Sequence, residues 1–123
     1  GHTSAPRLLN VTLTKNRTFG SGGVISCSGT VIENSVIWDN EPSNILWYPN
    51  HISFSDVQDG YAGSGNIMHE PLFNNPQKND FSLSPNSPCI DTGDPKSALD
   101  PDGTAADMGA FYFEHDSNIV RIL

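Results

Sequence analysis

The chain has 123 residues, of which 36% are hydrophobic and 16% are charged, with 11 glycines and 9 prolines. This length allows one domain at most, and the abundance of turn-forming residues indicates an all-β fold with short strands. The net charge of −8 argues against nucleic acid and anionic membranes as partners, because both are bound through clusters of Lys and Arg.

Three local features of the sequence are interpreted before the fold: its first two residues, its two cysteines and the length of its apolar runs. Gly1 and His2 are interpreted as a cloning scar and are left out of the fold prediction. Cys27 and Cys89 can form one disulfide, but two buried thiols are favoured, because free cysteine packs as a small hydrophobic residue. No apolar run approaches the length of a membrane span.

An internal repeat occupies the N-terminal half. Residues 10–16 align with residues 34–40 at an offset of 24, so that Leu13 falls over Ile37, and Asn opens and closes both segments. A fainter copy places residues 31–36 over residues 52–57 at an offset of 21. Periods of this size are typical of a solenoid in which each repeat forms one turn.

The repeats predict three short strands per turn. In chain order the expected strands are residues 10–16, 23–27, 30–33, 34–40, 44–48 and 51–54. This pattern predicts a right-handed parallel β-helix of two to three coils over residues 3–65. Val11 and Leu13 are expected to point inward and Thr12 and Thr14 outward.

Asparagines at the corners of the expected coils have a structural interpretation. Asn tolerates left-handed backbone angles, and stacked Asn side chains can hydrogen-bond along the axis. Asn10 with Asn34, and Asn16 with Asn40, are the candidate rungs of such a ladder. The alternative is that these residues simply mark turns.

The C-terminal half loses the repeat. Residues 55–65 are expected to form a flexible loop, residues 80–83 a short strand, and residues 66–123 an irregular cap that ends the solenoid. The N-terminal coil around Leu8 and Leu13 has no evident cap. We therefore expect two chains to meet at that end as a homo-oligomer.

A series of short segments resembles the C-terminal region of bacterial secreted right-handed parallel β-helix repeat proteins, which have a pectate-lyase-like fold. The segments are, in chain order, NSVIWDN (34–40), SDVQ (55–58), GNI (65–67), PLF (71–73), SPCIDTGDP (87–95), DPDG (100–103) and ADMGA (106–110). The resemblance implies an extracellular or cell-surface setting and an elongated solenoid, but no particular reaction. The chain departs from the family in having few coils and no recognisable anchor.

An acidic cluster in the expected cap is a candidate metal site. Its members are Asp91, Asp94, Asp100, Asp102 and Asp107. Calcium takes six to eight oxygen ligands, which carboxylates and loop carbonyls can supply. The alternative is that these residues stabilise turns through bonds to nearby backbone groups. Calcium is therefore a candidate cofactor, with no cofactor assigned.

Aromatic residues on one coil and its following loop suggest a polysaccharide ligand, because exposed rings can stack on sugars. They are Trp38, Trp47, Tyr48 and Tyr61. Packing inside the coil or against the cap is the alternative. We expect a non-enzymatic end-piece, structural, adhesive or glycan-binding. A fragment of a polysaccharide lyase or glycoside hydrolase is the second hypothesis, with carboxylate pairs such as Asp39 with Glu41 or Asp56 with Asp59.

Overall fold

A computed structural model describes residues 7–17, 29–41 and 51–115, and the structural statements below concern these ranges. Their regular structure is almost entirely β, with a single turn of 3-10 helix. The elements are β1 (Arg7–Leu9), β2 (Thr12–Thr14), β3 (Val31–Glu33), β4 (Val36–Trp38), β5 (His51–Ser53), β6 (Asp56–Val57), β7 (Phe73–Asn75), η1 (Pro76–Lys78) and β8 (Asp80–Leu83). The prediction of an all-β fold class is confirmed, and so is the predicted short strand at residues 80–83.

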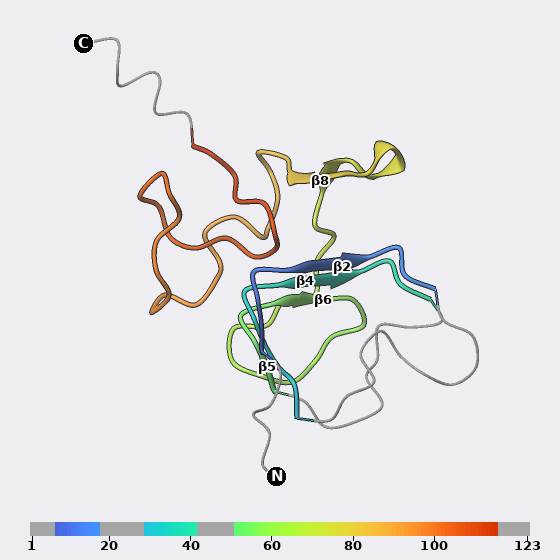
Figure 1. Cartoon of the computed structure of the whole chain (residues 1–123), viewed down its shortest axis with the longest axis horizontal. Helices are drawn as coiled ribbons and strands as arrows, with labels where there is room; N and C mark the ends of the chain where they lie inside the picture. The colour runs from blue at the N-terminus through green and yellow to red at the C-terminus, as the bar shows by residue number, and fades with distance from the viewer. Residues whose placement is uncertain (1–6, 18–28, 42–50, 116–123) are drawn as a thin grey trace.

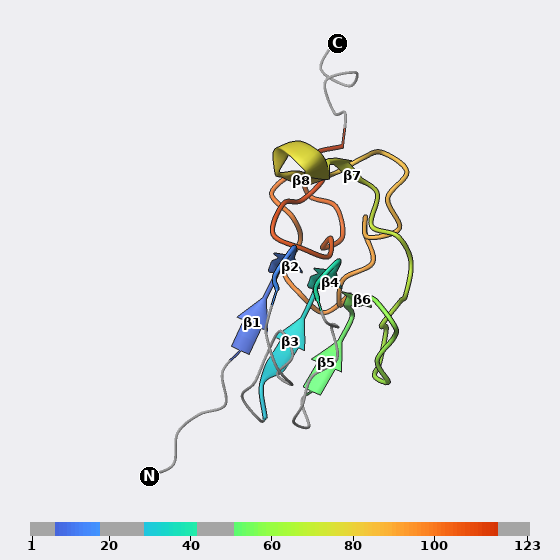
Figure 2. The same ribbon diagram turned by 90° about the vertical axis from the view of Figure 1, so that its right-hand side faces the viewer.

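Two parallel sheets, β1-β3-β5 and β2-β4-β6, each take one strand from three successive segments of the chain. We call these segments the first repeat (residues 7–17), the second repeat (29–41) and the third repeat (51–59). Figure 1 shows the second sheet with its strands stacked from β2 to β6, and Figure 2 shows β1, β3 and β5 side by side, with β2, β4 and β6 side by side above them. A third, antiparallel sheet is the hairpin β7-β8.

The register of the sheets confirms one predicted offset and corrects the other. Leu13 pairs with Ile37, as the 24-residue offset predicted. Ile52 pairs with Ile32 rather than with Val31, so the predicted offset of 21 is wrong and the true offset is 20. A slip of one residue would turn Ile52 away from the core, because side chains alternate between the faces of a strand.

The same backbone bend joins the two sheets in every repeat. Asn10, Asn34 and Phe54 have φ angles of 53°, 53° and 49°, in the left-handed region. Such a conformation costs a side chain free energy, and Asn tolerates it best. The bend ends β1 and starts β2 within the first repeat, which explains why β2 is shorter than the strand predicted over residues 10–16.

A ladder of polar side chains crosses the repeats one residue after the bend. The Val11 N–H donates to Ser35 Oγ at 3.2 Å, the Ser35 N–H to Ser55 Oγ at 3.1 Å, and the Ser55 N–H to Asn66 Oδ1 at 3.0 Å. Each serine hydroxyl also donates to the carbonyl two residues before it, that of Glu33 or of Ser53. The ladder therefore satisfies backbone groups that the sheets leave unpaired at the corner.

The predicted asparagine ladder is confirmed at one of its two rungs. Asn40 Oδ1 accepts hydrogen bonds from the Asn16 side chain at 3.0 Å and from the Asn16 backbone at 2.9 Å. Asn10 and Asn34 occupy equivalent positions, but Asn10 donates to the Asp107 carbonyl and Asn34 donates to Ser97 Oγ. This second pair therefore fastens the C-terminal region (residues 68–115) to the repeats.

Apolar side chains pack into two separate clusters. The inner cluster lies in the angle between the two parallel sheets and contains Ile32, Ile37, Ile52 and Val57, with Leu8, Leu13 and Tyr61 against it. The outer cluster lies between β2-β4-β6 and the C-terminal region and contains Val36, Leu83, Cys89 and Met108, with Trp38, Ile67, Phe73, Ile90 and Phe113 against it. The sheet β2-β4-β6 therefore has both faces covered, which suits parallel strands.

The C-terminal region spreads over the outer face of the repeats, as Figures 1 and 2 show. The Ala110 N–H donates to Thr12 Oγ1 at 2.9 Å, and the Gly109 N–H donates to the Asn34 carbonyl at 2.8 Å. A separate stretch, which we call the end segment (residues 60–67), closes the third repeat. In it, the Asn66 amide donates to the Ile52 carbonyl at 3.0 Å, and Ile67 forms a parallel bridge with Asp56.

Two parts of the sequence prediction need correction. Asp56 and Val57 form β6, where a flexible loop was expected, because their backbone is bonded on both sides: the Asp56 N–H donates to the Ser35 carbonyl and the Val57 N–H donates to the Ile67 carbonyl. Arg7–Leu9 form β1, ahead of the first predicted strand. The predicted strands at residues 23–27 and 44–48 lie outside the described residues, as does Cys27, whereas Cys89 is a buried free thiol as predicted.

Substitution of Gly63 by alanine is expected to destabilise the protein by about 1–3 kcal/mol, the usual cost of overpacking. A Cβ at this position would lie 2.1 Å from the Ile52 carbonyl oxygen, so the backbone of the end segment or of β5 would have to move. Denaturant unfolding of Gly63→Ala measures the loss. Ser64→Ala, at an exposed neighbour, is the control, and equal stability of the two variants would contradict the packing described here.

Candidate functional site

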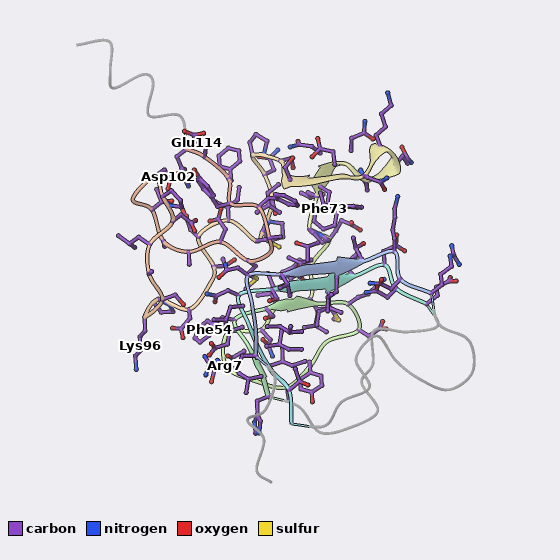
Figure 3. The ribbon with its side chains drawn as sticks, viewed as in Figure 1. Arg7, Phe54, Phe73, Lys96, Asp102 and Glu114 are labelled. Atoms are coloured by element: carbon purple, nitrogen blue, oxygen red, sulfur yellow. The ribbon has the colours of Figure 1, made fainter. Side chains whose placement is uncertain are left out.

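A groove of about 280 Å³ lies where β2, β4 and β6 end, beside the hairpin β7-β8. Three of its residues, Thr14, Trp38 and Gln58, occupy equivalent positions in the three repeats. The other lining residues are Asp39, Glu70, Phe73 and Pro76. Figure 3 shows Phe73 between the hairpin and the sheet. The groove therefore runs across the repeats and is completed by the C-terminal region.

The lining of the groove combines an aromatic surface with carboxylates. Trp38 is half-buried, with one side packed on the outer cluster, and Phe73 packs against the same cluster. Asp39 and Glu70 are exposed. Gln58 Oε1 accepts the Asp39 N–H at 2.7 Å, which fixes the amide beside the ring. An aromatic face flanked by fixed polar groups can hold a sugar through ring contact and hydroxyl hydrogen bonds.

A cation holds the hairpin against the first repeat near this groove. Lys15 Nζ donates to the Pro76 carbonyl and lies 5.7 Å from the centre of the Phe81 ring. Phe81 in turn packs edge-on against Phe73, with ring centres 5.3 Å apart. These contacts position the Phe73 wall of the groove relative to Trp38.

The aromatic residues predicted to bind a ligand are not gathered in one place. Trp38 lines the groove, whereas Tyr61 packs against the inner cluster at the end of the repeats. Trp47 and Tyr48 lie outside the described residues. Sequence reasoning missed Gln58, Glu70 and Phe73. The repeat offset could have found Gln58, but Glu70 and Phe73 belong to the C-terminal region, which has no repeat.

Asp107 is the centre of the predicted acidic cluster. Its carboxylate is buried, and it accepts the Asp91 N–H at 2.7 Å and the Phe113 N–H at 2.6 Å. The Asp107 N–H donates to Asp100 Oδ2 at 3.1 Å. Burial raises the pKa of Asp107. Burial and the neighbouring negative charge of Asp107 raise the pKa of Asp100 to about 6.

The outer members of the acidic cluster stabilise turns. Asp102 accepts the Thr104 hydroxyl at 2.6 Å and the His115 N–H at 2.8 Å. These hydrogen bonds, that of Thr104 most strongly, lower the pKa of Asp102 to about 2. Asp94 Oδ1 accepts the Lys96 N–H at 2.9 Å. Within the described ranges, no group of three or more His, Cys, Asp or Glu side chains is placed to hold a metal ion. The contacts match the turn interpretation, and calcium stays a prediction.

A buried carboxyl group joins the sheet to the C-terminal region. Asp56 lies opposite Val36 on the outer face of β6 and is fully buried. Its Oδ2 accepts the Cys89 thiol at 3.2 Å, and its Oδ1 accepts the His69 N–H at 3.1 Å. Burial raises the pKa of Asp56 to about 6, and burial followed by the Asp56 charge raises the pKa of the Cys89 thiol. Asp56, predicted as half of an outer carboxylate pair, is therefore covered.

A comparison of the chain with protein-family models, with curated proteins and with solved structures finds no match. In the part of the chain that the structure describes, no helix is both long enough and apolar enough to cross a membrane.

Proposed function

We propose that the chain is the end-piece of a secreted or cell-surface, right-handed parallel β-helix that attaches to glycans and does not itself catalyse a reaction. Both parallel sheets use the same three repeats, with offsets of 24 and 20 residues, which supports one coil per repeat. A right-handed course follows from the general rule for connections between parallel strands.

The groove around Trp38 is the observation that carries the glycan-binding proposal. A half-buried indole, held at the ends of three parallel strands, offers a rigid surface for the apolar face of a sugar ring. Gln58, Thr14 and the carboxylates of Asp39 and Glu70 supply hydrogen-bonding groups around it. The two acids favour neutral glycans and disfavour polyuronates, whose carboxylates they would repel.

Replacement of Trp38 by alanine is expected to weaken glycan binding about tenfold or more, because the ring supplies most of the apolar contact area. Glycan-array binding identifies the ligand, and isothermal titration calorimetry then compares the variants, with and without calcium. Tyr112→Ala removes an exposed ring elsewhere in the C-terminal region and is the matched control.

Because Trp38 also packs on the outer cluster, a second variant tests the groove without removing packing. Glu70→Gln keeps the shape of an exposed side chain and is expected to weaken binding less than Trp38→Ala. Unchanged affinity in both variants would refute the groove as the site. A strict calcium requirement would move the site to the acidic cluster around Asp107.

The second candidate is an enzyme acting on polysaccharide, and one observation favours it. Asp39 and Glu70 line the same groove, and most glycoside hydrolases use two carboxyl groups beside the bound sugar as their catalytic residues. Release of reducing ends from any polysaccharide on the array, abolished in both Asp39→Asn and Glu70→Gln, would replace the binding proposal with this one.

A further inference from the structure

The lining of the groove around Trp38 carries charge of one sign only. Asp39 and Glu70 are its charged residues, and none of its residues is Lys, Arg or His. Both acids are exposed. In the part of the chain that the structure describes, neither carboxylate forms an ion pair with a basic side chain. The groove therefore presents two negative charges beside its aromatic rings.

The backbone of Asp39 is fixed by the ends of the strands. Its N–H donates to Gln58 Oε1 at 2.7 Å, and its carbonyl accepts the Lys15 N–H at 2.8 Å. Its φ angle of 60° lies in the left-handed region, which Asp tolerates better than most residues. Because Asp39 directly follows Trp38, the carboxylate and the indole enter the groove from one fixed stretch of backbone.

Two residues that can carry positive charge lie on the segments beside the groove. Lys15 Nζ donates to the Pro76 carbonyl and lies 5.7 Å from the centre of the Phe81 ring, so its ammonium group is held by the hairpin. His69 precedes Glu70 in the chain. Neither side chain belongs to the lining. A ligand in the groove therefore meets carboxylates and no cation from the lining itself.

A positively charged amino sugar matches this lining better than a neutral sugar does. Its protonated amine can donate charge-assisted hydrogen bonds to a carboxylate, and the face of an indole attracts cations. The apolar face of the same sugar can pack on the ring of Trp38. A hydroxyl or an N-acetyl group in place of the amine keeps the ring contact but removes the charge. The acids that repel polyuronates thus attract polysaccharides of opposite charge.

We propose that the groove prefers polysaccharides with free amines, such as β-1,4-linked glucosamine, over neutral glycans. This inference rests on the proposed glycan-binding function and adds the class of glycan. Trp38 supplies the ring contact, and Asp39 and Glu70 set the preference. Ion pairs between exposed groups contribute little each, so we expect a preference of about tenfold rather than an absolute requirement.

The test compares hexasaccharides with the same β-1,4 linkage by isothermal titration calorimetry with the full chain. The ligands are the hexamers of glucosamine, N-acetylglucosamine and glucose, at about pH 5.5, where the sugar amines are protonated. The glucosamine hexamer is expected to bind about tenfold more tightly than the other two. Added salt should weaken the binding of this hexamer alone. A lysine hexamer, which has amines but no sugar rings, should bind far more weakly, and equal binding of it would overturn the proposal.

Protein variants assign the preference to the two acids. The double variant Asp39→Asn, Glu70→Gln is expected to lose the preference for the glucosamine hexamer and to keep its affinity for the glucose hexamer. The control is Asp91→Asn, Glu114→Gln, which removes the same charge from exposed residues of the C-terminal region. Asp91 also has a φ angle of 60°, so it matches Asp39 in conformation. The control should keep the preference.

The outcomes separate this inference from glycan binding itself. Equal affinity for the three hexasaccharides, lost in Trp38→Ala, would leave the groove as a glycan site and overturn the preference for amines. A preference that persists in Asp39→Asn, Glu70→Gln would overturn it as well. If neither these hexasaccharides nor any glycan on the array binds, the glycan-binding proposal and the preference both fail.

Discussion

Lowering the pH from about 7.5 to about 5 is expected to stabilise the protein against unfolding. Burial raises the pKa of Asp56 from 3.8 to about 6, and Asp100 and Asp107 shift in the same direction. A group with a raised pKa in the folded state contributes stability that is complete below its unfolded pKa, near 3.8. That contribution is lost as the pH rises through 6.

The expected gain from Asp56 alone over this interval is about 1 kcal/mol, within a maximum near 3 kcal/mol for its whole shift. Asp102 has a lowered pKa and acts in the opposite sense, but it titrates below the interval. Urea unfolding at the two pH values, followed by tryptophan fluorescence, measures the change in the free energy of unfolding.

Asp56→Asn provides the matched variant for the pH experiment. The amide keeps an acceptor for the His69 N–H and removes the buried charge, so we expect higher stability at pH 7.5 and a shallower dependence on pH. The dependence that remains is assigned to Asp100 and Asp107. If lowering the pH from 7.5 to 5 instead decreased the free energy of unfolding of the unsubstituted chain, Asp56 would not be buried as an ionisable group.

Substitution of Ile37 by alanine is expected to cost about 2–5 kcal/mol, the usual range for a cavity in a core. Ile37 is fully buried at the centre of the inner cluster, between Leu13 and Val57 in the adjacent strands. The rigid sheets on either side limit collapse around the cavity. Such a loss is a large fraction of the stability of a domain this size.

Leu9→Ala is the control for Ile37→Ala, because Leu9 lies on β1 and is 49% exposed. Its effect on the midpoint of thermal unfolding should be small beside that of Ile37→Ala. Similar losses in the two variants would mean that the inner cluster is not the core of the repeats.

The repeat could be predicted from the sequence where similar side chains, either aliphatic or Asn, recur at a fixed spacing. Leu13 over Ile37 and Asn16 over Asn40 follow from such spacing, and the structure confirms both. The third repeat was misplaced by one residue because Val31 and Ile32 are both suitable neighbours for Ile52 in a sequence alignment. The choice between them depends on which side chain faces the core, and that is decided only when the strands pair.

The groove and the buried Asp56 could not be predicted from the sequence. Phe73 and Glu70 reach Trp38 because the C-terminal region folds back over the outer face, and no period in its sequence indicates that course. Asp56 has a poor intrinsic preference for a strand, so sequence reasoning placed it in a loop. Contacts with Cys89 and His69, distant along the chain, outweigh that preference.

The way in which the C-terminal region is fastened to the repeats has a consequence for folding during synthesis. The Asn10 amide donates to the carbonyl of Asp107, 97 positions later, and Thr12 Oγ1 accepts the N–H of Ala110, 98 positions later. The outer cluster therefore cannot form until the residues around Met108 and Phe113 have left the ribosome. Until then the outer face of β2 and β4 stays exposed, and it is open to chaperones and to aggregation during translation. Contacts of such long range also slow folding after synthesis.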